Sequence, residues 1–212
     1  MELLELMERL GRLKGVERKG WVLRGFSPAE DVAQHSFEVC SLSLLLSLEL
    51  KGRVNLEKVL TMAVLHDWPE ALTGDLLPSS PEKREREERA LEEMVGDREW
   101  GRRIGELWRE YREGKTLEAK VVQLADGLSV LLQCVRYGGG KVPEGLRDLW
   151  EEVGRRIRNL LRDLPEFSYL LSWMESRRVS DTSPGTPPFP PREDGEEPWR
   201  GDGGGGGRRV SP

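Results

Sequence analysis

Apolar residues recur at helical spacing along most of the chain, and residues that favour helix ends separate one apolar segment from the next. Asn55 precedes an apolar segment that extends to His66, and Thr116 precedes a longer one that extends to about Arg136. No segment shows the alternation of apolar and polar residues that marks a half-buried strand, and no internal repeat is present. The pattern predicts an all-α fold.

Further helices are expected where proline and capping residues interrupt the pattern. Ser27-Pro28-Ala29-Glu30 has the form of a capping box with proline at the first helical position. It predicts a helix from there to about Leu50. Pro69 and Gly74 predict a short irregular turn after the following helix. The remaining helices are expected over residues 80–94, 97–113 and 143–164.

The segment from Arg177 to the last residue differs in composition from the rest of the chain. It holds seven of the 13 prolines and eight of the 24 glycines, five of them consecutive at positions 203–207. Such a segment has too few apolar side chains to build a core, and its six basic residues balance six acidic ones. The sequence therefore predicts one folded domain over residues 1–176 and a disordered tail over residues 177–212.

Composition and charge exclude several classes of protein. Hydrophobic residues make up 37% of the 212 residues, which suffices for one core, and the net charge of −5 disfavours binding to nucleic-acid polymers. The longest apolar run, residues 42–50, falls well short of the roughly 18 residues that span a bilayer. The N-terminal segment is acidic, unlike a secretory signal. We therefore expect a cytoplasmic protein with no membrane partner.

The chain has only two histidines, and both occupy positions of chemical interest. His35 shares a helical face with Val39 and Leu46, so its side chain is expected to point into the core. His66 stands at the end of the next predicted helix, with Asp67 beside it. A histidine on an apolar face is more often a core residue than a metal ligand, so each histidine taken alone favours the core interpretation.

Asp126 lies in the middle of a predicted helix, on the same face as Val122 and Ser129. A carboxylate at such a position is costly unless a nearby cation neutralises it. A divalent metal ion held together with the two histidines and Asp67 would do so, and this ligand set leaves coordination positions for water or substrate. The alternative is that Asp126 pairs with an arginine while the histidines only pack, and the residues alone leave both interpretations open.

The order and spacing of these residues resemble the HD-domain metal-dependent phosphohydrolases. His35, then His66-Asp67 after an intervening helix, then Asp126 in a later helix follow the H…HD…D signature of that family. Within the family, the 5'-deoxynucleotidase group is similar over residues 20–24 (GWVLR), 32–36 (VAQHS) and 65–75 (LHDWPEALTGD). The resemblance covers about residues 10–164 and leaves out the predicted tail.

The resemblance implies a metal centre with two further acidic residues beside it. The implied metal ligands are His35, His66, Asp67 and Asp126. Glu70 and Asp75 would complete the catalytic site: Glu70 would handle protons of the attacking water or the leaving group, and Asp75 would contact the sugar. The metal ion would be manganese, cobalt or magnesium, since the residue types do not choose among them.

The resemblance also implies how the substrate is held. Trp21 corresponds to a tryptophan that packs near the deoxyribose in the family. Some members carry an arginine directly before this tryptophan to hold the phosphate, but Gly20 stands there in this chain. Arg18 is therefore our first candidate for contacting the phosphate, as part of the catalytic site, and Arg24 is the second. An acidic protein needs such a cation to bind a dianionic monophosphate.

The resemblance thus implies an enzyme that hydrolyses 2'-deoxyribonucleoside 5'-monophosphates to deoxynucleoside and phosphate, as a homodimer. One alternative is another HD hydrolase, either a nucleoside triphosphate phosphohydrolase or a cyclic-nucleotide phosphodiesterase. Those enzymes usually need additional substrate-binding segments, so the short chain argues against them. A second alternative is a metal-containing nucleotide-binding regulatory module without turnover. Glu70 and Asp75 beside the ligands disfavour it.

Truncation after Arg177 is expected to leave the melting temperature and the activity nearly unchanged. The predicted tail builds no core, and its balanced charge offers no strong attraction to the folded domain. Thermal denaturation and phosphate release would be measured on the truncated and full-length proteins side by side. A large fall in either quantity would show that the tail docks on the domain or on a second subunit.

Overall fold

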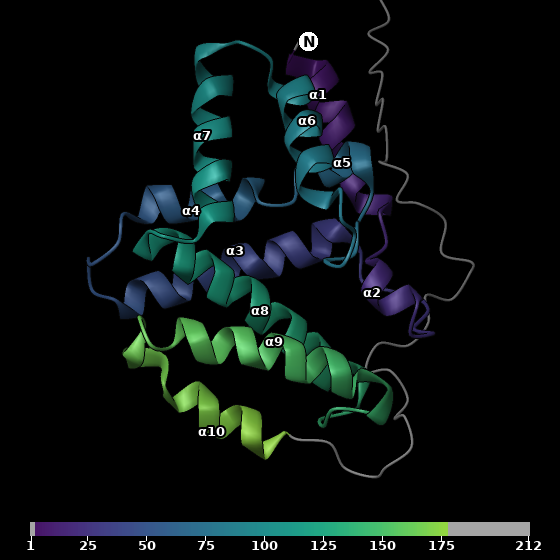
Figure 1. Cartoon of the computed structure of the whole chain (residues 1–212), viewed down its shortest axis with the longest axis vertical. Coiled ribbons are helices and arrows are strands. Elements are labelled where there is room, and N and C mark those ends of the chain that lie inside the picture. The colour runs from purple at the N-terminus through teal and green to yellow at the C-terminus, as the bar shows by residue number, and fades with distance from the viewer. Residues whose placement is uncertain (1–2, 178–212) are drawn as a thin grey trace, which may run out of the picture.

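A computed structural model describes residues 3–177 of the chain, and helices dominate this part (Figure 1). This part of the chain contains no β-strand. It does contain an isolated antiparallel β-bridge between Glu17 and Asp31. None of the helices in the same part is long and apolar enough to cross a membrane. The predicted all-α fold class is confirmed. The helices are α1 (Leu3–Gly11), α2 (Lys19–Val22), α3 (Val32–Glu49), α4 (Leu56–Leu65), α5 (Glu70–Thr73), α6 (Lys83–Val95), α7 (Glu99–Glu113), α8 (Leu117–Tyr137), α9 (Arg147–Leu160) and α10 (Tyr169–Ser176).

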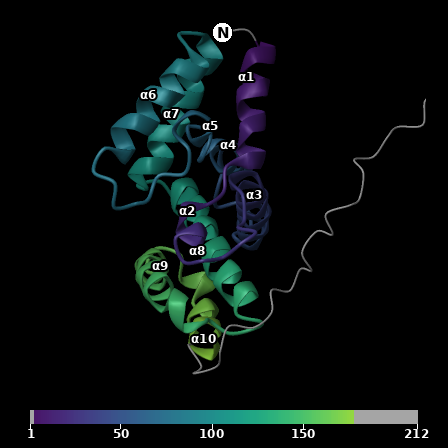
Figure 2. The same ribbon diagram turned by 90° about the vertical axis from the view of Figure 1, so that its right-hand side faces the viewer.

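Helix α8 runs through the middle of the molecule and contacts helices on both sides. It packs against α3, α4 and α7, and on its other side against α9 (Figure 1). Helices α1, α6 and α7 form one end of the elongated molecule, and α9 with α10 forms the other (Figure 2). Side chains near the middle of α8 are therefore held between two groups of helices.

The main hydrophobic core lies where α3, α4, α8 and α9 meet. Its fully buried side chains include Met62, Leu124, Leu131 and Ile157. Gly127 lets α9 approach α8 closely, since a Cβ atom there would lie 3.1 Å from Ile157 Cγ1. A second apolar cluster, which includes Leu91, Met94 and Trp108, joins α6 and α7 to the rest. Burial of this kind contributes about 1.5–3 kcal/mol for each large side chain and fixes the relative positions of the helices.

Among the predicted helix starts, those at Asn55 and Thr116 are confirmed and that at Ser27 is wrong, while α6, α7 and α9 begin two to four residues later than predicted. Asn55 and Thr116 each accept a hydrogen bond from a backbone N–H in the first turn of α4 and α8. Helix α3, however, does not begin at Ser27 but at Val32, after the reciprocal capping box of Asp31 and Gln34. The reason is tertiary, because two backbone hydrogen bonds, from Arg18 to Glu30 and from Val32 to Val16, hold the backbone at Glu30 and Asp31 in an extended pairing outside the helix.

The C-terminal part contains a helix that the sequence pattern does not predict. Helix α9 ends at Leu160, and α10 follows a single turn of 3₁₀ helix at Pro165–Phe167. Helix α10 lies along α9, where Met174 Cε lies 2.8 Å from the position that a Cβ atom would take on Gly154. The rings of Trp150 and Trp173 lie 5.8 Å apart, between their centroids. These contacts between distant residues, rather than local periodicity, hold this short helix.

Residues 178–212 of the predicted tail lie outside the described residues, as do residues 1–2. Arg177 belongs to the described part and is tied to the loop after α8. Its backbone oxygen accepts a hydrogen bond from the N–H of Val142 (3.3 Å), and its guanidinium donates to the carbonyl oxygen of Gly140 (3.0 Å). A truncation that tests the tail must therefore retain Arg177.

Candidate metal centre

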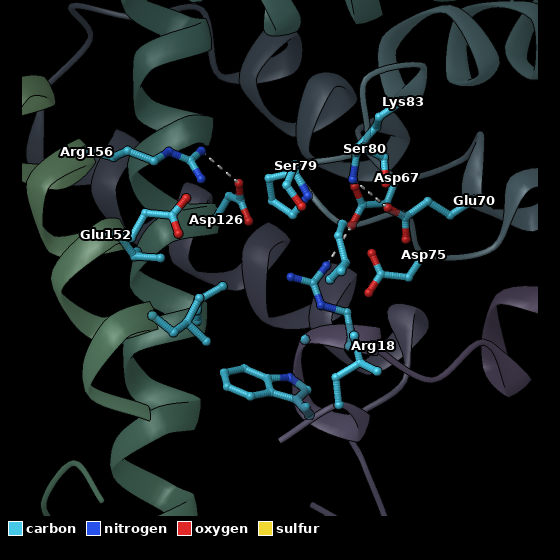
Figure 3. A pocket seen from close by; sticks show the side chains of 18 of the residues that line it. Arg18, Asp67, Glu70, Asp75, Ser79, Ser80, Lys83, Asp126, Glu152 and Arg156 are labelled. Atoms are coloured by element: carbon cyan, nitrogen blue, oxygen red, sulfur yellow. Dashed lines mark hydrogen bonds and ion pairs between the residues drawn. The ribbon is translucent and has the colours of Figure 1, made fainter. Parts of the chain in front are cut away.

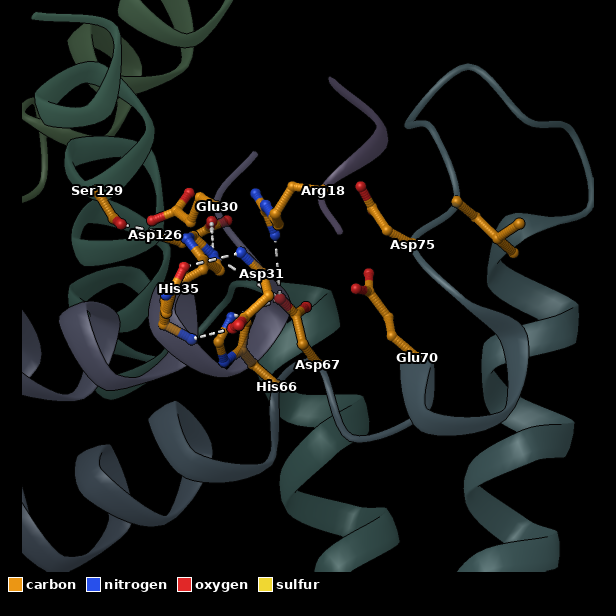
Figure 4. A network of polar contacts seen from close by, with 12 residues as sticks. Arg18, Glu30, Asp31, His35, His66, Asp67, Glu70, Asp75, Asp126 and Ser129 are labelled. Atoms are coloured by element: carbon orange, nitrogen blue, oxygen red, sulfur yellow. Dashed lines mark hydrogen bonds and ion pairs between the residues drawn. The ribbon is translucent and has the colours of Figure 1, made fainter. Parts of the chain in front are cut away.

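Three helices bring both histidines and Asp126 together inside the molecule (Figure 4). His35 lies in the first turn of α3, His66 directly follows α4, and Asp126 lies in the middle of α8. Each residue offers one ligand atom, and these three atoms lie within 4.8 Å of one another. The packing of α3 and α4 against α8 is what brings these distant positions together.

Asp67, the fourth predicted ligand, points toward the same position. Its Oδ2 lies 3.1 Å from Nε2 of His66 and 3.7 Å from Nε2 of His35. Oδ1 of Asp126 lies 3.3 Å from Nε2 of His35. Two imidazoles and two carboxylates thus converge in one cluster, which we call the His/Asp centre.

The hydrogen bonds of the two imidazoles suit metal binding. In each ring, Nε2 is buried and has no hydrogen-bond partner among the described residues. The other ring nitrogen is engaged: Nδ1 of His66 lies 2.8 Å from the carbonyl oxygen of Ala63, and Nδ1 of His35 lies 3.1 Å from Oγ of Ser129. A carbonyl oxygen only accepts, so Nδ1 of His66 carries a proton, and Nε2 is the nitrogen left to bind a metal ion. The residues therefore fit a divalent metal ion.

Electrostatics keeps both aspartates of the centre ionised. Burial opposes ionisation of Asp67, but His66, Arg18 and His35 outweigh it and hold the pKa of this carboxyl well below its usual range. Burial likewise opposes ionisation of Asp126, yet the pairing of Oδ1 with His35 and the charges of Arg156 and His66 outweigh it and lower the pKa of this carboxyl. Two ionised carboxylates at one buried position form a strong cation-binding site.

Glu70 has the opposite electrostatic environment. It begins α5 with its side chain 2% exposed, and Oε1 lies 3.5 Å from Nζ of Lys83. Oε2 has no hydrogen-bond partner in the described part of the chain. Burial, followed by the negative charges of Asp67 and Asp75, raises the pKa of Glu70 to about 10. This carboxyl therefore keeps its proton at neutral pH.

Asp75 and Arg18 complete the polar wall beside the centre. The backbone turns at Gly74, where φ is 66°, and Oδ2 of Asp75 then accepts a hydrogen bond from the N–H of Lys19 (2.6 Å). Nη1 of Arg18 lies 3.3 Å from Oδ2 of Asp67. Burial opposes the charge of Arg18, but Asp67 and neighbouring carboxylates outweigh it and raise the pKa of Arg18. The guanidinium therefore stays charged.

The other two predicted substrate-binding residues, Trp21 and Arg24, have firm protein partners. Trp21 is buried in α2, its Nε1 donates to Oε2 of Glu30 (3.0 Å), and its ring packs edge-on against Tyr137. Arg24 donates to Oδ2 of Asp148 (2.6 Å). Asp148 lies outside the His/Asp centre. Arg18, the other candidate for contacting the phosphate, pairs instead with Asp67, which belongs to the centre.

A cavity of about 1100 Å³ opens beside the His/Asp centre (Figure 3). Seven of the nine predicted site residues line it, and the two histidines lie behind its wall. Its volume is sufficient for a small-molecule ligand. The seven are Arg18, Trp21, Arg24, Asp67, Glu70, Asp75 and Asp126.

Three residues of this cavity were not predicted from the sequence. The hydroxyl of Tyr111 donates to Oδ2 of Asp126 (3.4 Å), and Nη2 of Arg156 lies 3.8 Å from the same oxygen. Lys83 pairs with Glu70 from the start of α6. These residues lie on α7, α9 and α6, outside the recognised motifs, so no local spacing could mark them.

The fold and the site together define a class of protein. A helical bundle that holds two imidazoles and two carboxylates at the edge of a polar cavity is the arrangement of a helical metallohydrolase. The family is identified by comparison with known proteins: the HD domain family model matches residues 10–167. The chain belongs to the HD domain family.

Several characterised relatives are similar over most of their length. The 5'-deoxynucleotidase HDDC2 of Homo sapiens is 28% identical over 186 residues, which cover 84% of this chain and 87% of the human protein. The protein of the same name from Danio rerio is 33% identical over 141 residues, or 64% of this chain and 69% of that one. The predicted resemblance to the 5'-deoxynucleotidase group is confirmed.

A solved structure from Pyrococcus furiosus, described as a conserved hypothetical protein, has a similar fold. It superposes with a TM-score of 0.62 and 31% identity, covering 77% of this chain and 96% of the other. A structure described as a predicted metal-dependent phosphohydrolase from Magnetospirillum magnetotacticum superposes with a TM-score of 0.61 at 23% identity, covering 82% of this chain and 91% of the other. The likeness at 23% identity supports the fold alone.

The substitution Glu70→Gln is expected to remove a pH dependence of stability in the metal-free protein. The pKa of about 10 in the folded state lies above the ordinary value of 4.5. Between these two pH values the unfolded chain has released a proton that the folded chain retains, so the free energy of unfolding falls as pH rises. The variant carries no such group and should melt several degrees above the wild type at pH 8, but not near pH 5.

Melting temperatures from pH 5 to 9, measured with a chelator present, would check this prediction. Glu106→Gln on α7 is the control, because Glu106 is exposed and lies away from the His/Asp centre. The difference between Glu70→Gln and wild type should widen with pH, while the difference for the control should not. Parallel curves for both variants would show that Glu70 ionises as an ordinary glutamate.

Proposed function

We propose that this protein is a metal-dependent 5'-nucleotidase that hydrolyses 2'-deoxyribonucleoside 5'-monophosphates to deoxynucleoside and phosphate. The observation that carries the proposal is the convergence of four nitrogen and oxygen ligands on one edge of a cavity that also holds a charged arginine and a protonated glutamate. The relatives named 5'-deoxynucleotidase support the same reaction. They do not favour a triphosphate hydrolase, a cyclic phosphodiesterase or a module without turnover.

The charges around the cavity suggest how the substrate lies. Arg18 stands beside Asp67, so a phosphate next to the His/Asp centre would meet both the metal ion and this guanidinium. Apolar side chains line another part of the cavity and would face the sugar and the base. They are Trp21, Val130, Leu149 and Val153.

A divalent ion bound by His35, His66, Asp67 and Asp126 would supply Lewis acidity and lower the pKa of a bound water molecule. Arg18 would offset negative charge on the phosphoryl oxygens as the bond to the leaving oxygen breaks. Glu70 keeps a proton at neutral pH, so its carboxyl would donate this proton to the 5'-oxygen of the departing nucleoside. We therefore propose the leaving group, rather than the attacking water, as the partner of Glu70.

Trp21 and Asp75 would set the preference for deoxyribose. The hydrogen bond to Glu30 and the contact with Tyr137 hold the Trp21 ring rigidly in the cavity wall. A rigid ring can exclude a 2'-hydroxyl group sterically. Asp75 is fixed by the N–H of Lys19 and keeps one oxygen for a sugar hydroxyl. We propose this steric mechanism in place of a polar contact to the 2'-position.

The metal ion in this proposal is manganese, cobalt or magnesium. The mixed nitrogen and oxygen ligands suit a divalent transition metal such as the first two, and the carboxylates also suit magnesium. The location in the cytoplasm stays a prediction, as does the disordered character of the tail.

The substitutions His66→Ala and Glu70→Gln are expected to impair the enzyme in different ways. His66→Ala removes a metal ligand, so metal content and phosphate release should fall together. Glu70→Gln should retain most of the metal but slow phosphate release by about 10²- to 10⁴-fold, because the proton donor is lost. Metal content and single-turnover phosphate release from deoxyribo- and ribonucleoside monophosphates would be measured on each protein.

Glu87→Gln provides a matched control for this experiment. Glu87 is also buried and also pairs with Lys83, but it does not line the cavity. Its replacement should leave single-turnover phosphate release near the wild-type rate. Full activity of His66→Ala would rule out the proposed metallohydrolase, and loss of metal from Glu70→Gln would make Glu70 a ligand rather than a proton donor.

We also propose that the protein forms a homodimer through the exposed face of α3. Four large apolar side chains lie there at helical spacing: Phe37, Leu44, Leu45 and Leu48 are 76%, 37%, 60% and 59% exposed. A contiguous apolar face of this kind on a soluble protein commonly marks a protein interface. The same face on a second copy would cover it in a symmetric pair.

Leu45→Glu is expected to convert the dimer to a monomer, because it places a charge within the apolar face. Sedimentation equilibrium should give about twice 24.1 kDa for the wild type and 24.1 kDa for the variant. Tyr169→Glu is the control, since Tyr169 on α10 is equally exposed at 60%. A monomeric wild type, or a variant that remains dimeric, would contradict the proposed interface.

A further inference from the structure

A line of polar contacts extends from His35 away from the cavity, between α3 and α8. Nδ1 of His35 lies 3.1 Å from Oγ of Ser129, and Ser129 donates to Oε2 of Glu38 (2.9 Å). Arg136 donates through both terminal nitrogens to the two oxygens of Glu38. We call Arg136, Glu38 and Ser129 the Ser129 chain. His35 and Ser129 are fully buried, so water does not compete for their contact.

The Ser129 chain determines which nitrogen of His35 carries a proton. Burial opposes ionisation of Glu38, but its hydrogen bonds with Arg136 outweigh burial and lower its pKa, so this carboxylate only accepts hydrogen bonds. The single hydroxyl proton of Ser129 therefore points at Glu38. The hydroxyl oxygen must then accept a hydrogen bond from Nδ1–H of His35, which leaves Nε2 as the nitrogen that faces the His/Asp centre.

We propose that Ser129 and Glu38 are positioning residues that fix the tautomer and orientation of His35 for metal binding. The inference rests on the metal centre of the proposed function and extends it beyond the four ligands. Hydrogen bonds to the far nitrogen of a metal-binding histidine orient the ring and raise its basicity, and their loss commonly weakens metal binding about 10- to 100-fold. The role of Arg136 is to keep Glu38 ionised and to fix its position through two hydrogen bonds.

The geometry distinguishes this role from simple cross-linking of two helices. His66 receives the same assistance from the backbone oxygen of Ala63, which no side-chain substitution can remove. His35 depends instead on side chains of another helix, α8, and on Glu38 one turn along its own helix. A cross-link would affect the melting temperature alone, whereas a positioning role would change the metal affinity and the ligand field.

Ser129→Ala tests the proposal, with Ser47→Ala as the matched control. Ser47 is also a buried serine, but its hydroxyl donates to the carbonyl oxygen of Ser43 within α3. Mn²⁺ affinity would be measured by calorimetry and the Co²⁺ site by its visible absorption spectrum. We expect Ser129→Ala to bind Mn²⁺ about 10- to 100-fold more weakly with a changed Co²⁺ spectrum, and the control to change affinity less than about twofold.

Glu38→Gln decides the question if Ser129→Ala fails to fold, since Glu38 lies nearer the surface. Its amide offers one acceptor oxygen in place of two, and the NH2 group faces a donor of Ser129 or Arg136, so one of these hydrogen bonds is lost and metal affinity should fall. Because the two residues act in series, the double variant should bind Mn²⁺ no more weakly than the weaker single variant.

Two results would overturn the inference. If folded Ser129→Ala and Glu38→Gln both keep wild-type Mn²⁺ affinity and Co²⁺ spectrum, the Ser129 chain only connects α3 and α8. Such a result leaves the proposed function intact, because the wild type still binds metal. If the wild type itself binds neither Mn²⁺ nor Co²⁺, the proposed function fails together with the inference.

Discussion

The structure depends on holding two largely buried carboxylates, Asp67 and Asp126, against two imidazoles at one position. A buried, unpaired carboxylate costs several kcal/mol, so these side chains are tolerable only where opposite charge meets them from several elements at once. Helices α3 and α8 each contribute one group, and the end of α4 contributes a histidine and an aspartate. Burial of the polar groups is itself unfavourable. The apolar core between these helices, which includes Leu124 and Met62, supplies the stability that holds them together.

Much of this arrangement follows from local features of the sequence. Helical periodicity and capping residues predict α4 and α8 closely, and the helix positions of His35 and Asp126 already place both side chains on inward faces. The start of α3 shows where local rules fail. The capping pattern at Ser27 predicts the start there, but the helix begins after Asp31, whose bridge with Glu17 holds the preceding backbone out of the helix. No local pattern in the sequence indicates the pairing of Glu17 with Asp31.

The remaining parts of the site could not be predicted because they depend on contacts between helices. Tyr111 and Arg156 reach Asp126 from α7 and α9, and nothing in their own segments distinguishes them from other aromatic or charged residues of amphipathic helices. Ser129 is an intermediate case. Its position on the same face as Asp126 is visible in the sequence, but its contacts with His35 and Glu38 require the packing of α3 on α8.

The same electrostatic constraint divides the acidic residues of the site into two kinds. Asp67 and Asp126 face imidazoles and arginine, so they stay ionised and suit a cation. Glu70 is buried near the carboxylates of Asp67 and Asp75, and the charges of Arg18 and Lys83 do not offset burial and these carboxylates, so it keeps its proton. Carboxyl groups whose pKa values are driven apart in this way can act as ligand and as acid within one site. Burial together with the charge of Asp67, one of the proposed ligands, thus also prepares the neighbouring glutamate to donate a proton.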